Sequence, residues 1–461
     1  MLVPKLEKTI GIEVYATRSL GIGGVIRQKA EDFAVEEVLV DRSKAEIARS
    51  EGLAERAALG ASPVKNRYLL CVLTKRNWDT FIALRNIAAQ LGISTRQIQI
   101  AGIKDAKAIT AQHITIEGTS FDEIQQVHVK DMQVRPLGYL RGKLSAYYLL
   151  GNSFHVTIRG INHSESTIQK RMIKTVEELE TTGGIPNFFG HQRFGTTRPI
   201  THLVGEAIVK GDFRKAAMLF LAKPSLHEHP ASRQARKELQ ASQDFNKAVR
   251  DFPKQLRYER LMLEQLTAKP NDFPGAFKRL PIKLRQLFVQ AYQSYLFNKS
   301  LSKRIQVGFS LNKGEVGDYV INVDRNGLPV QATSKIASGP VLSEINNSIK
   351  TGRMRLAIPL IGFKQHPSQG IQGEIERQIL QTENVSEEHF KITCMPEISV
   401  RGELRTAITP IGNFSVDQIL KEQAHPSKCT VKVSFTLNRS SYATIFLREL
   451  MKTRNPIKAG F

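Results

Sequence analysis

Short runs of alternating apolar and polar residues predict strands at several places along the chain. The run YLLCVLTK (68–75) is apolar and β-branched, and QIQIAGIKD (97–105) and AITAQHITI (108–116) follow as two short alternating runs. Further on, SFHVTIRG (153–160) and KCTVKVSFTL (428–437) alternate regularly, so each predicts a strand with one apolar face.

Helical spacing separates several of these strands. Four apolar residues share one helical face before a stop at Gly92: Leu84, Ile87, Ala88 and Leu91. Ser164 is a good N-cap for a second helix that ends at Gly183–Gly184, and its apolar positions recur at helical spacing: Ile168, Met172, Val176 and Leu179. Strands joined by helices, without a Rossmann fingerprint, predict an α+β sheet domain.

The middle of the chain has a different pattern. From Thr201 to about Arg304 it is mostly helical and basic, and one apolar stripe there predicts the core helix of a separate domain: Leu284, Leu287, Phe288, Ala291 and Tyr295. Residues 308–363 are Gly-rich and strand-like, and SSYATIFLREL (440–450) reads as a strand passing into a helix. One interpretation is that the C-terminal strands return to the first sheet and that the helical middle is an insertion.

Composition narrows the class of protein. The chain has 461 residues, 41% hydrophobic and 24% charged, which is typical of a globular protein of two or three domains. No apolar run approaches the roughly 20 residues needed to span a bilayer, and the N-terminus lacks the apolar core of a signal peptide, so we expect a cytoplasmic protein. Three cysteines outside any CxxC pair argue against a disulfide framework: Cys71, Cys394 and Cys429.

The charge balance indicates a polyanionic partner. Lys and Arg number 66 against 43 Asp and Glu, a net charge of +23. Nucleic acid is the commonest partner of such a protein, while a ribosome-like environment, an anionic membrane surface or simple solubility are alternatives. The excess extends over stretches such as 254–304, which suggests a broad basic surface.

Most familiar catalytic motifs are missing from the sequence. The glycine cluster GIGG (21–24) lacks GxGxxG spacing, and the sequence contains no GxxxxGK[ST], HExxH or GxSxG motif. His227 and His229 are close in sequence, but a surface turn explains them better than a metal site. We therefore expect no metal and no nucleotide cofactor.

Three polar and aromatic clusters remain: EDFAVEE (31–37), GIKDAKA (102–108) and GGIPNFFGHQRFG (183–195). In the third, Phe188, Phe189 and Phe194 lie among four glycines beside Asn187. Glycine permits close approach of the backbone, aromatic rings stack on bases, and Asn can bond a base edge. A turn with a hydrophobic plug is the structural alternative.

These clusters, in this order, resemble the TruD family of tRNA pseudouridine synthases, and the chain is similar to an archaeal-type member. GNSFHVTIR, LFVQAYQSYLFN and SFTLNRSSYATIFLREL also match, so the resemblance covers essentially the whole chain. It implies an α+β fold in which a discontinuous pseudouridine-synthase domain with a mixed or antiparallel sheet (1–199 plus 398–461) carries an inserted, largely helical TRUD domain (200–397).

The resemblance also implies a reaction and its residues. Uridine in tRNA, at position 13 of the D-arm, would be detached from its ribose, turned and reattached through C5 without any cofactor. Asp105 matches the catalytic aspartate, and Phe33, Asn187 and Phe189 match positions that line the pocket of a flipped base. Arg27 stands where bacterial relatives have a lysine, so the resemblance implies that it is the cation that keeps Asp105 charged; an Arg27 that only binds phosphate or solvent is the alternative. Tyr442 stands where those relatives have phenylalanine.

Two stretches depart from the family pattern. LRGKLSAYYLLGN (140–152) is more apolar than the basic version expected before GNSF, and the Ala-rich segment 44–61 resembles a helical insertion. Two other functions stay open: an RNA chaperone that keeps the fold without turnover, and an N-glycosylase that cuts the same bond and releases the base. The sequence does not indicate the oligomeric state or the order of chemical steps.

Overall fold

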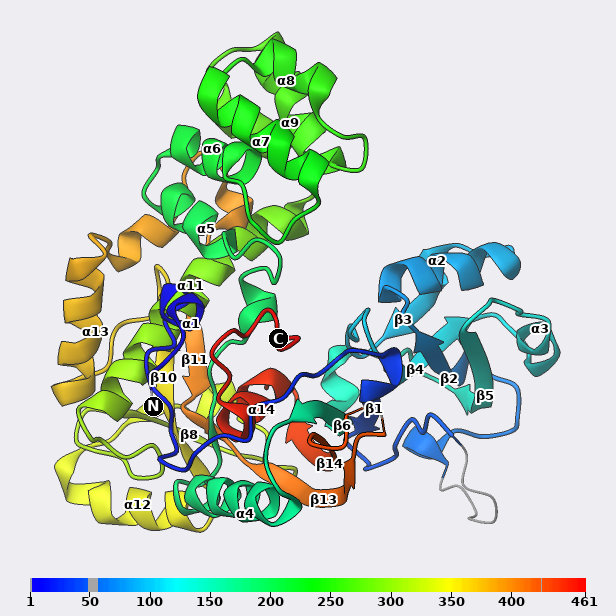
Figure 1. The fold of residues 1–461 in the computed structure, drawn as a ribbon, viewed down its shortest axis with the longest axis vertical. Coiled ribbons are helices and arrows are strands. Elements are labelled where there is room, and N and C mark those ends of the chain that lie inside the picture. Colours follow the sequence, from blue (N-terminus) through cyan, green and yellow to red (C-terminus); the bar gives the residue numbers. More distant parts are fainter. Residues whose placement is uncertain (1, 49–56, 424) are drawn as a thin grey trace.

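A mixed sheet of eight strands is the largest feature of the computed structural model, which describes residues 2–48, 57–423 and 425–461 (Figure 1). The strand order is β13-β14-β6-β1-β4-β2-β5, with β3 paired to β4. In chain order the strands are β1 (Phe33–Leu39), β2 (Tyr68–Arg76), β3 (Ile98–Ile100), β4 (Ile109–Glu117), β5 (Met132–Leu140), β6 (Leu149–Ile161), β13 (Ile411–Lys421) and β14 (Cys429–Asn438).

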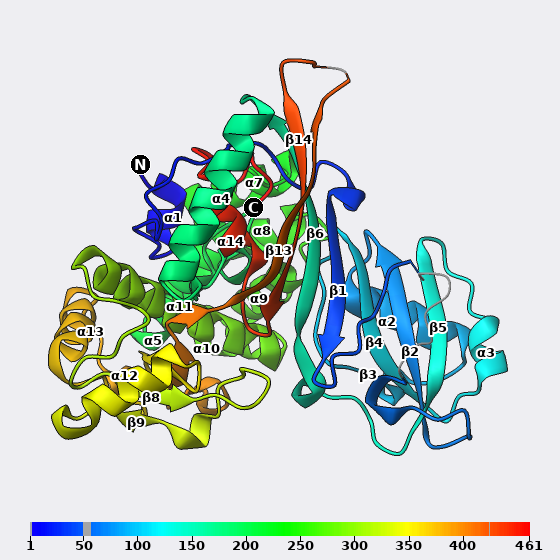
Figure 2. The same ribbon diagram turned by 90° about the horizontal axis from the view of Figure 1, so that it is seen from below.

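The sheet combines the two ends of the chain. Strand β14 pairs antiparallel with β6, with Phe435 opposite Phe154, and β13 pairs with β14. The alternation read from the sequence is correct, because Val431, Val433 and Phe435 are all buried. Figure 2 shows these C-terminal strands beside β6 and β1. The predicted α+β fold with a discontinuous sheet is thereby confirmed.

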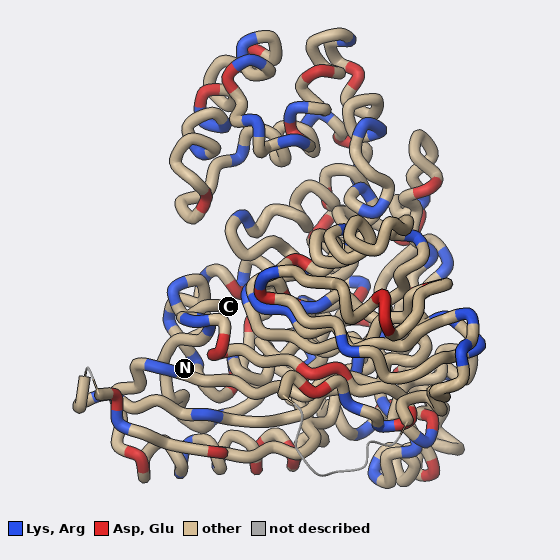
Figure 3. Tube along the Cα trace, turned by 90° about the vertical axis from the view of Figure 1, so that its right-hand side faces the viewer, with Lys and Arg blue, Asp and Glu red and all other residues tan. Residues whose placement is uncertain are grey.

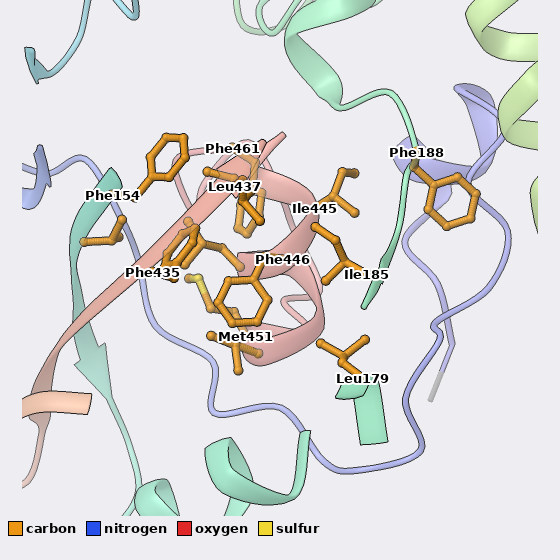
Figure 4. Packing of buried hydrophobic residues seen from close by; sticks show 14 of the residues in the cluster. Phe154, Leu179, Ile185, Phe188, Phe435, Leu437, Ile445, Phe446, Met451 and Phe461 are labelled. Atoms are coloured by element: carbon orange, nitrogen blue, oxygen red, sulfur yellow. The ribbon is translucent and has the colours of Figure 1, made fainter. Parts of the chain in front are cut away.

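Helices cover the sheet where the apolar faces of its strands require it. Helix α2 (Thr80–Gln90) packs on the outer strands, while α4 (Glu165–Thr181) and α14 (Ala443–Met451) lie against the β6, β13 and β14 end. Figure 4 shows the core there, with Phe435 and Phe446 in contact at 4.7 Å between ring centroids. Helix α4 begins after the predicted N-cap Ser164 and buries its predicted apolar positions. Two short helices, α1 (Lys5–Thr9) and α3 (Phe121–Gln125), complete this part.

The middle of the chain forms a second, mainly helical core. Its helices are α5 (Thr201–Val209), α6 (Phe213–Ala222), α7 (Pro230–Ser242), α8 (Phe245–Asp251), α9 (Arg257–Ala268), α10 (Phe273–Lys278), α11 (Ile282–Gln306), α12 (Leu342–Lys350) and α13 (Gly370–Thr382). A four-stranded antiparallel sheet accompanies them: β8 (Tyr319–Asn322), β9 (Lys335–Ile336), β10 (Met354–Leu360) and β11 (Glu403–Thr406). A two-stranded ribbon pairs β7 (Ile185–Pro186) with β12 (Ile408–Thr409). The domain boundaries at 199/200 and 397/398 stay a prediction.

The structure corrects three details of the sequence interpretation. Helix α11 is buried almost all round rather than along one stripe, because it packs against both cores; even Asn298 and Ser302 are fully buried. The segment 440–450 starts as a turn, with Tyr442 as N-cap of α14, and not as a strand. Residues 308–363 contain the helix α12 among their strands.

Residues 49–56 of the predicted helical insertion at 44–61 lie outside the described residues, and the described residues on either side form no α-helix: Lys44 forms an isolated bridge with Val38. The flanking part that is described contains a 3-10 turn at Ala58–Gly60. Cys71 and Cys429 are buried, whereas Cys394 is exposed. No helix in the described parts of the chain is long and apolar enough to cross a membrane.

A buried histidine makes the fold sensitive to acid. His202 stacks on Tyr295 at 5.3 Å and meets Phe194 edge-on at 5.2 Å, and burial lowers its pKa from 6.5 to about 4. Between these two pH values the unfolded chain binds a proton that the folded protein excludes, so this contribution to stability is full above pH 6.5 and is lost as pH falls through 4.

We therefore expect acidification from pH 7 to pH 4 to lower the free energy of unfolding less in a His202→Gln variant than in wild type. The two decreases should differ by about 2–4 kcal/mol. Urea unfolding at several pH values measures this difference. The exposed His227→Gln variant is the matched control and should keep the wild-type pH slope. Equal slopes for wild type and His202→Gln would contradict the assignment.

Candidate active site

The sheet topology brings Asp105 and Arg27 together. Strands β1 and β4 are parallel, with Ala34 opposite Ile109, so the segments that precede them meet at the same end of the sheet. Residues 101–108, here called the GIKD loop, lead into β4, and the segment that carries Arg27 leads into β1. Arg27 and Asp105, which are far apart in the sequence, therefore become neighbours because β1 pairs with β4.

Arg27 contacts Asp105, the C-terminal segment and Phe33, and we call these residues the first group. One guanidinium nitrogen, Nη2, lies 3.5 Å from Oδ1 of Asp105, and Nη1 donates to the carbonyl of Gly460 at 3.2 Å. The guanidinium lies over the ring of Phe33, 4.0 Å from its centroid. Burial lowers the pKa of Arg27, and the charge of Asp105 opposes that change. Asp105 itself keeps 38% of its side chain exposed, so its carboxylate is open to a ligand.

A buried lysine fixes the backbone of the GIKD loop. Nζ of Lys75 donates to the carbonyl of Asp105 at 2.8 Å and to that of Trp78 at 2.7 Å. Burial lowers the pKa of Lys75 to about 8, and the charge of Asp105 acts against this shift. Thr80 adds two bonds, because its hydroxyl donates to the Lys104 carbonyl and accepts from the Lys104 amide. Lys75 and Thr80 thus fix the backbone that carries Asp105 without contacting its carboxylate.

The neighbouring lysine of the motif points away from Asp105. Nζ of Lys104 pairs with Glu37, which also accepts from the backbone amide of His113 at 3.0 Å. Both members of the Lys104–Glu37 pair are buried. Arg27, and not the adjacent Lys104, therefore forms the ion pair with the Asp105 carboxylate.

The other three predicted residues form a second group around Arg405. Nη2 of Arg405 donates to Oδ1 of Asn187 at 2.6 Å, and Nε donates to the Asn187 carbonyl at 2.9 Å. Its guanidinium also lies 4.0 Å from the ring centroid of Phe189. Nδ2 of Asn187 donates to Thr406, so both ends of the amide are oriented. Tyr442 meets Phe189 edge-on at 6.1 Å.

Gly190 lets Tyr442 approach this group closely. A Cβ at Gly190 would stand 2.9 Å from Cδ1 of Tyr442 and 2.8 Å from Oγ1 of Thr444. Both distances are shorter than carbon contacts allow. Close packing against Tyr442 and Thr444 therefore explains why a glycine follows NFF in the sequence.

The second group lines a cleft of about 660 Å³ between the β14–α14 turn and the middle of the chain. Asn187, Phe189 and Tyr442 all line it, whereas Arg27, Phe33 and Asp105 do not. Five arginines line the same cleft: Arg193, Arg355, Arg401, Arg405 and Arg439. Such a surface favours an anionic ligand.

The two groups border one hydrophobic core. Phe33 and Phe189 both belong to it, and Tyr442 packs against it. The C-terminus connects them, since Gly460 accepts from Arg27 while the ring of Phe461 lies 5.9 Å from that of His191. Phe33 is 1% exposed and Phe189 7% exposed, so their rings support Arg27 and Arg405.

Sequence reasoning missed Lys75 and Arg405. Lys75 closes a predicted strand, and Arg405 lies in RTAIT, where nothing in composition or spacing distinguishes it from other basic residues. Their importance comes from partners that are 30 and 218 positions away. A buried cation that binds only carbonyl oxygens leaves no pattern in a single sequence.

Arg405 supplies a test of the second group. Arg405→Met would leave oxygens of Asn187 and the carbonyl of Ser440 without their donor. We expect a loss of about 2–5 kcal/mol in the free energy of unfolding. Denaturant unfolding measures it, with the exposed Arg377→Met as matched control expected within about 0.5 kcal/mol of wild type. A similar stability of both variants would show that Arg405 does not hold Asn187.

Within the described residues, no group of three or more His, Cys, Asp or Glu side chains could hold a metal ion. The chemistry available at Asp105 is that of a carboxylate beside a guanidinium. A carboxylate can act as nucleophile or as general base.

Comparisons with known proteins match nearly the whole chain. Residues 9–450 match the family model described as tRNA pseudouridine synthase D (TruD). The chain is 37% identical over 459 residues to a protein from Methanococcoides burtonii named tRNA pseudouridine synthase D, covering 99% of each. A Thermococcus onnurineus protein of the same name is 34% identical over 438 residues, 95% of this chain and 97% of that one. A crystal structure described as tRNA pseudouridine synthase D (TruD) from Methanosarcina mazei superposes with a TM-score of 0.82 at 37% identity, covering 99% of this chain and 100% of that one.

Proposed function

This chain belongs to the tRNA pseudouridine synthase D (TruD) family and is an isomerase of tRNA uridine, and from that premise we propose how its own residues carry the reaction. The observation that carries the proposal is the Arg27–Asp105 pair at the end of the parallel strands β1 and β4. A partly exposed carboxylate beside a buried cation can act as nucleophile or base at a ribose carbon.

Asp105 is the catalytic carboxylate in this proposal. The reaction breaks the bond between N1 of the uracil and C1′ of the ribose and forms a bond between C5 and C1′. The hydrogen on C5 leaves as a proton and N1 gains one, so atoms balance and nothing is oxidised. Arg27 keeps Asp105 ionised when the substrate closes the site, since burial alone would favour the neutral acid.

The uridine reaches Asp105 flipped out of its stack, and the second group receives it. Asn187 is oriented by Arg405 and Thr406 and keeps one amide hydrogen for a uracil carbonyl. Tyr442 is half-buried and offers its ring and hydroxyl at the cleft, backed by Phe189. Phe33 acts through Arg27, whose guanidinium it supports.

The target we propose is uridine 13 in the D-arm of tRNA. This position rests on family membership, and the charge distribution is consistent with a large folded RNA. Figure 3 shows Lys and Arg spread over both the helical and the sheet parts rather than gathered in one tail. Phosphate contacts from such a surface weaken with rising salt.

Tritium release tests the reaction. Wild-type protein is incubated with tRNA carrying tritium at C5 of uridine, and tritium in solution is counted beside the number of abasic sites. We expect tritium release with every base retained. Abasic sites would indicate an N-glycosylase, and tight RNA binding without release of tritium would indicate a chaperone; either result would overturn the proposal.

A further inference from the structure

The loop that joins β5 to β6, residues 141–148, carries the most exposed aromatic ring in the described part of the chain. Tyr147 is 77% exposed, compared with 51% for Phe81 and 44% for Tyr258. Single exposed apolar side chains are common on protein surfaces, so the surroundings of the ring decide whether it binds a ligand. The loop lies within the stretch LRGKLSAYYLLGN, whose apolar character no part of the mechanism above explains.

The backbone that carries Tyr147 is firmly held. Leu144 is buried against Leu39 and Ala101, and its amide donates to the hydroxyl of Thr115 at 3.0 Å. The carbonyl of Tyr148 accepts from Val40 at 2.9 Å. The backbone under the exposed ring is therefore already ordered, so a ligand that stacks on the ring binds with little loss of conformational entropy in the protein.

Arg439 ties the same loop to the cleft. Its Nη1 donates to the carbonyl of Ala146 at 2.8 Å and lies 3.3 Å from those of Tyr147 and Leu149. Arg439 also lines the 660 Å³ cleft together with Tyr442.

The loop also touches the GIKD loop on its other side. Ala101, the first residue of the GIKD loop, packs on Leu144, and a Cβ at Gly102 would lie 3.1 Å from Cδ2 of Leu149. The loop that carries Tyr147 is therefore braced between the start of the GIKD loop and Arg439, which lines the cleft.

The surroundings of the ring fit RNA rather than an apolar protein surface. Arg141 and Lys143 are exposed in the same loop, and the net charge of the chain is +23. Tyr148 supports Tyr147 edge-on, with ring centroids 5.9 Å apart, and leaves its outer face open. An open aromatic face between cationic side chains is the usual platform for an unpaired base.

We propose that Tyr147 is a stacking platform for an unpaired nucleobase of the tRNA other than the target uridine. This inference rests on the proposed function. A base outside the target position would stack on the open face of Tyr147, and the exposed Arg141 and Lys143 would bind neighbouring phosphates.

The test compares Tyr147→Ala with Tyr147→Phe. We measure the Kd for tRNA by filter binding and the rate of tritium release in a single turnover at saturating protein. Tyr147→Ala is expected to raise Kd about 5- to 150-fold, equivalent to about 1–3 kcal/mol. The saturated rate should stay within about threefold of wild type, because Asp105 is untouched. Tyr147→Phe should bind like wild type, since it keeps the ring.

Tyr258→Ala on α9 is the matched control and should leave Kd unchanged. The stacking role is overturned if Tyr147→Ala binds tRNA as wild type does, if Tyr147→Phe is as weak as Tyr147→Ala, or if Tyr258→Ala weakens binding equally. Wild type that binds tRNA without releasing tritium, together with weakened binding by Tyr147→Ala, would refute the proposed function while supporting the stacking role. The two failures are thus distinguishable.

Discussion

Replacing Asp105 with asparagine is expected to lower the single-turnover rate of uridine isomerisation about 10³-fold or more while tRNA binding stays near wild type. Asparagine keeps the shape of the side chain but cannot act as nucleophile or base. The side chain is 38% exposed and accounts for little packing, so the free energy of unfolding should change by less than about 1 kcal/mol. Tritium release and filter binding on the same preparation separate the two effects.

A second aspartate provides the control for this variant. Asp122 is exposed in the first turn of α3, on the outer part of the sheet domain, and Asp122→Asn should turn over at the wild-type rate. Full activity of Asp105→Asn would refute the assignment of the carboxylate. A loss of both activity and tRNA binding would point to a structural role instead.

Replacing Arg27 with methionine should have the second largest effect, about 10²- to 10³-fold on the single-turnover rate. Methionine removes the only cation that an ion pair places within 4 Å of Asp105 among the described residues. The carboxylate would then enter a closed site without its counter-charge. Lysine at this position keeps the charge but cannot spread over Phe33, so Arg27→Lys should lie between wild type and Arg27→Met.

Arg27→Met and Arg27→Lys both place a residue other than glycine at the positive φ of 59° that Arg27 adopts, so any backbone strain is the same in both. A difference between them therefore reports charge rather than backbone strain. The exposed Arg18→Met controls for the loss of one positive charge from the protein as a whole. Equal activity of Arg27→Met and Arg27→Lys would show that Arg27 serves packing and not the ionisation of Asp105.

The sequence predicted best where a pattern repeats within a short stretch. The strand of Val431, Val433 and Phe435 and the helix capped by Ser164 follow from periods of 2 and 3.6 residues, and the structure has both. The pairing of Arg27 with Asp105 needed the resemblance, since only the strand order β1–β4 makes them neighbours. No local pattern encodes that order.

The sequence predicted least where a side chain acts through distant backbone atoms. Arg405 reaches Asn187 across 218 positions, and Lys75 reaches the Asp105 carbonyl across 30. Helix α11 was predicted with one apolar stripe because Gln293, Ser294 and Asn298 are polar, yet all three are buried and hydrogen-bonded. Hydrophobic periodicity cannot indicate a polar residue whose partner comes from another element.

A nucleotide-resolution map of pseudouridine tests the central claim most directly. Wild-type protein and Asp105→Asn are each incubated with a tRNA transcript that has uridine at position 13 and with one that has cytidine there. We predict one pseudouridine, at position 13, made by the wild type on the first transcript alone, with the mass of the RNA unchanged. Pseudouridine made equally by Asp105→Asn, or none made by the wild type, would contradict the account.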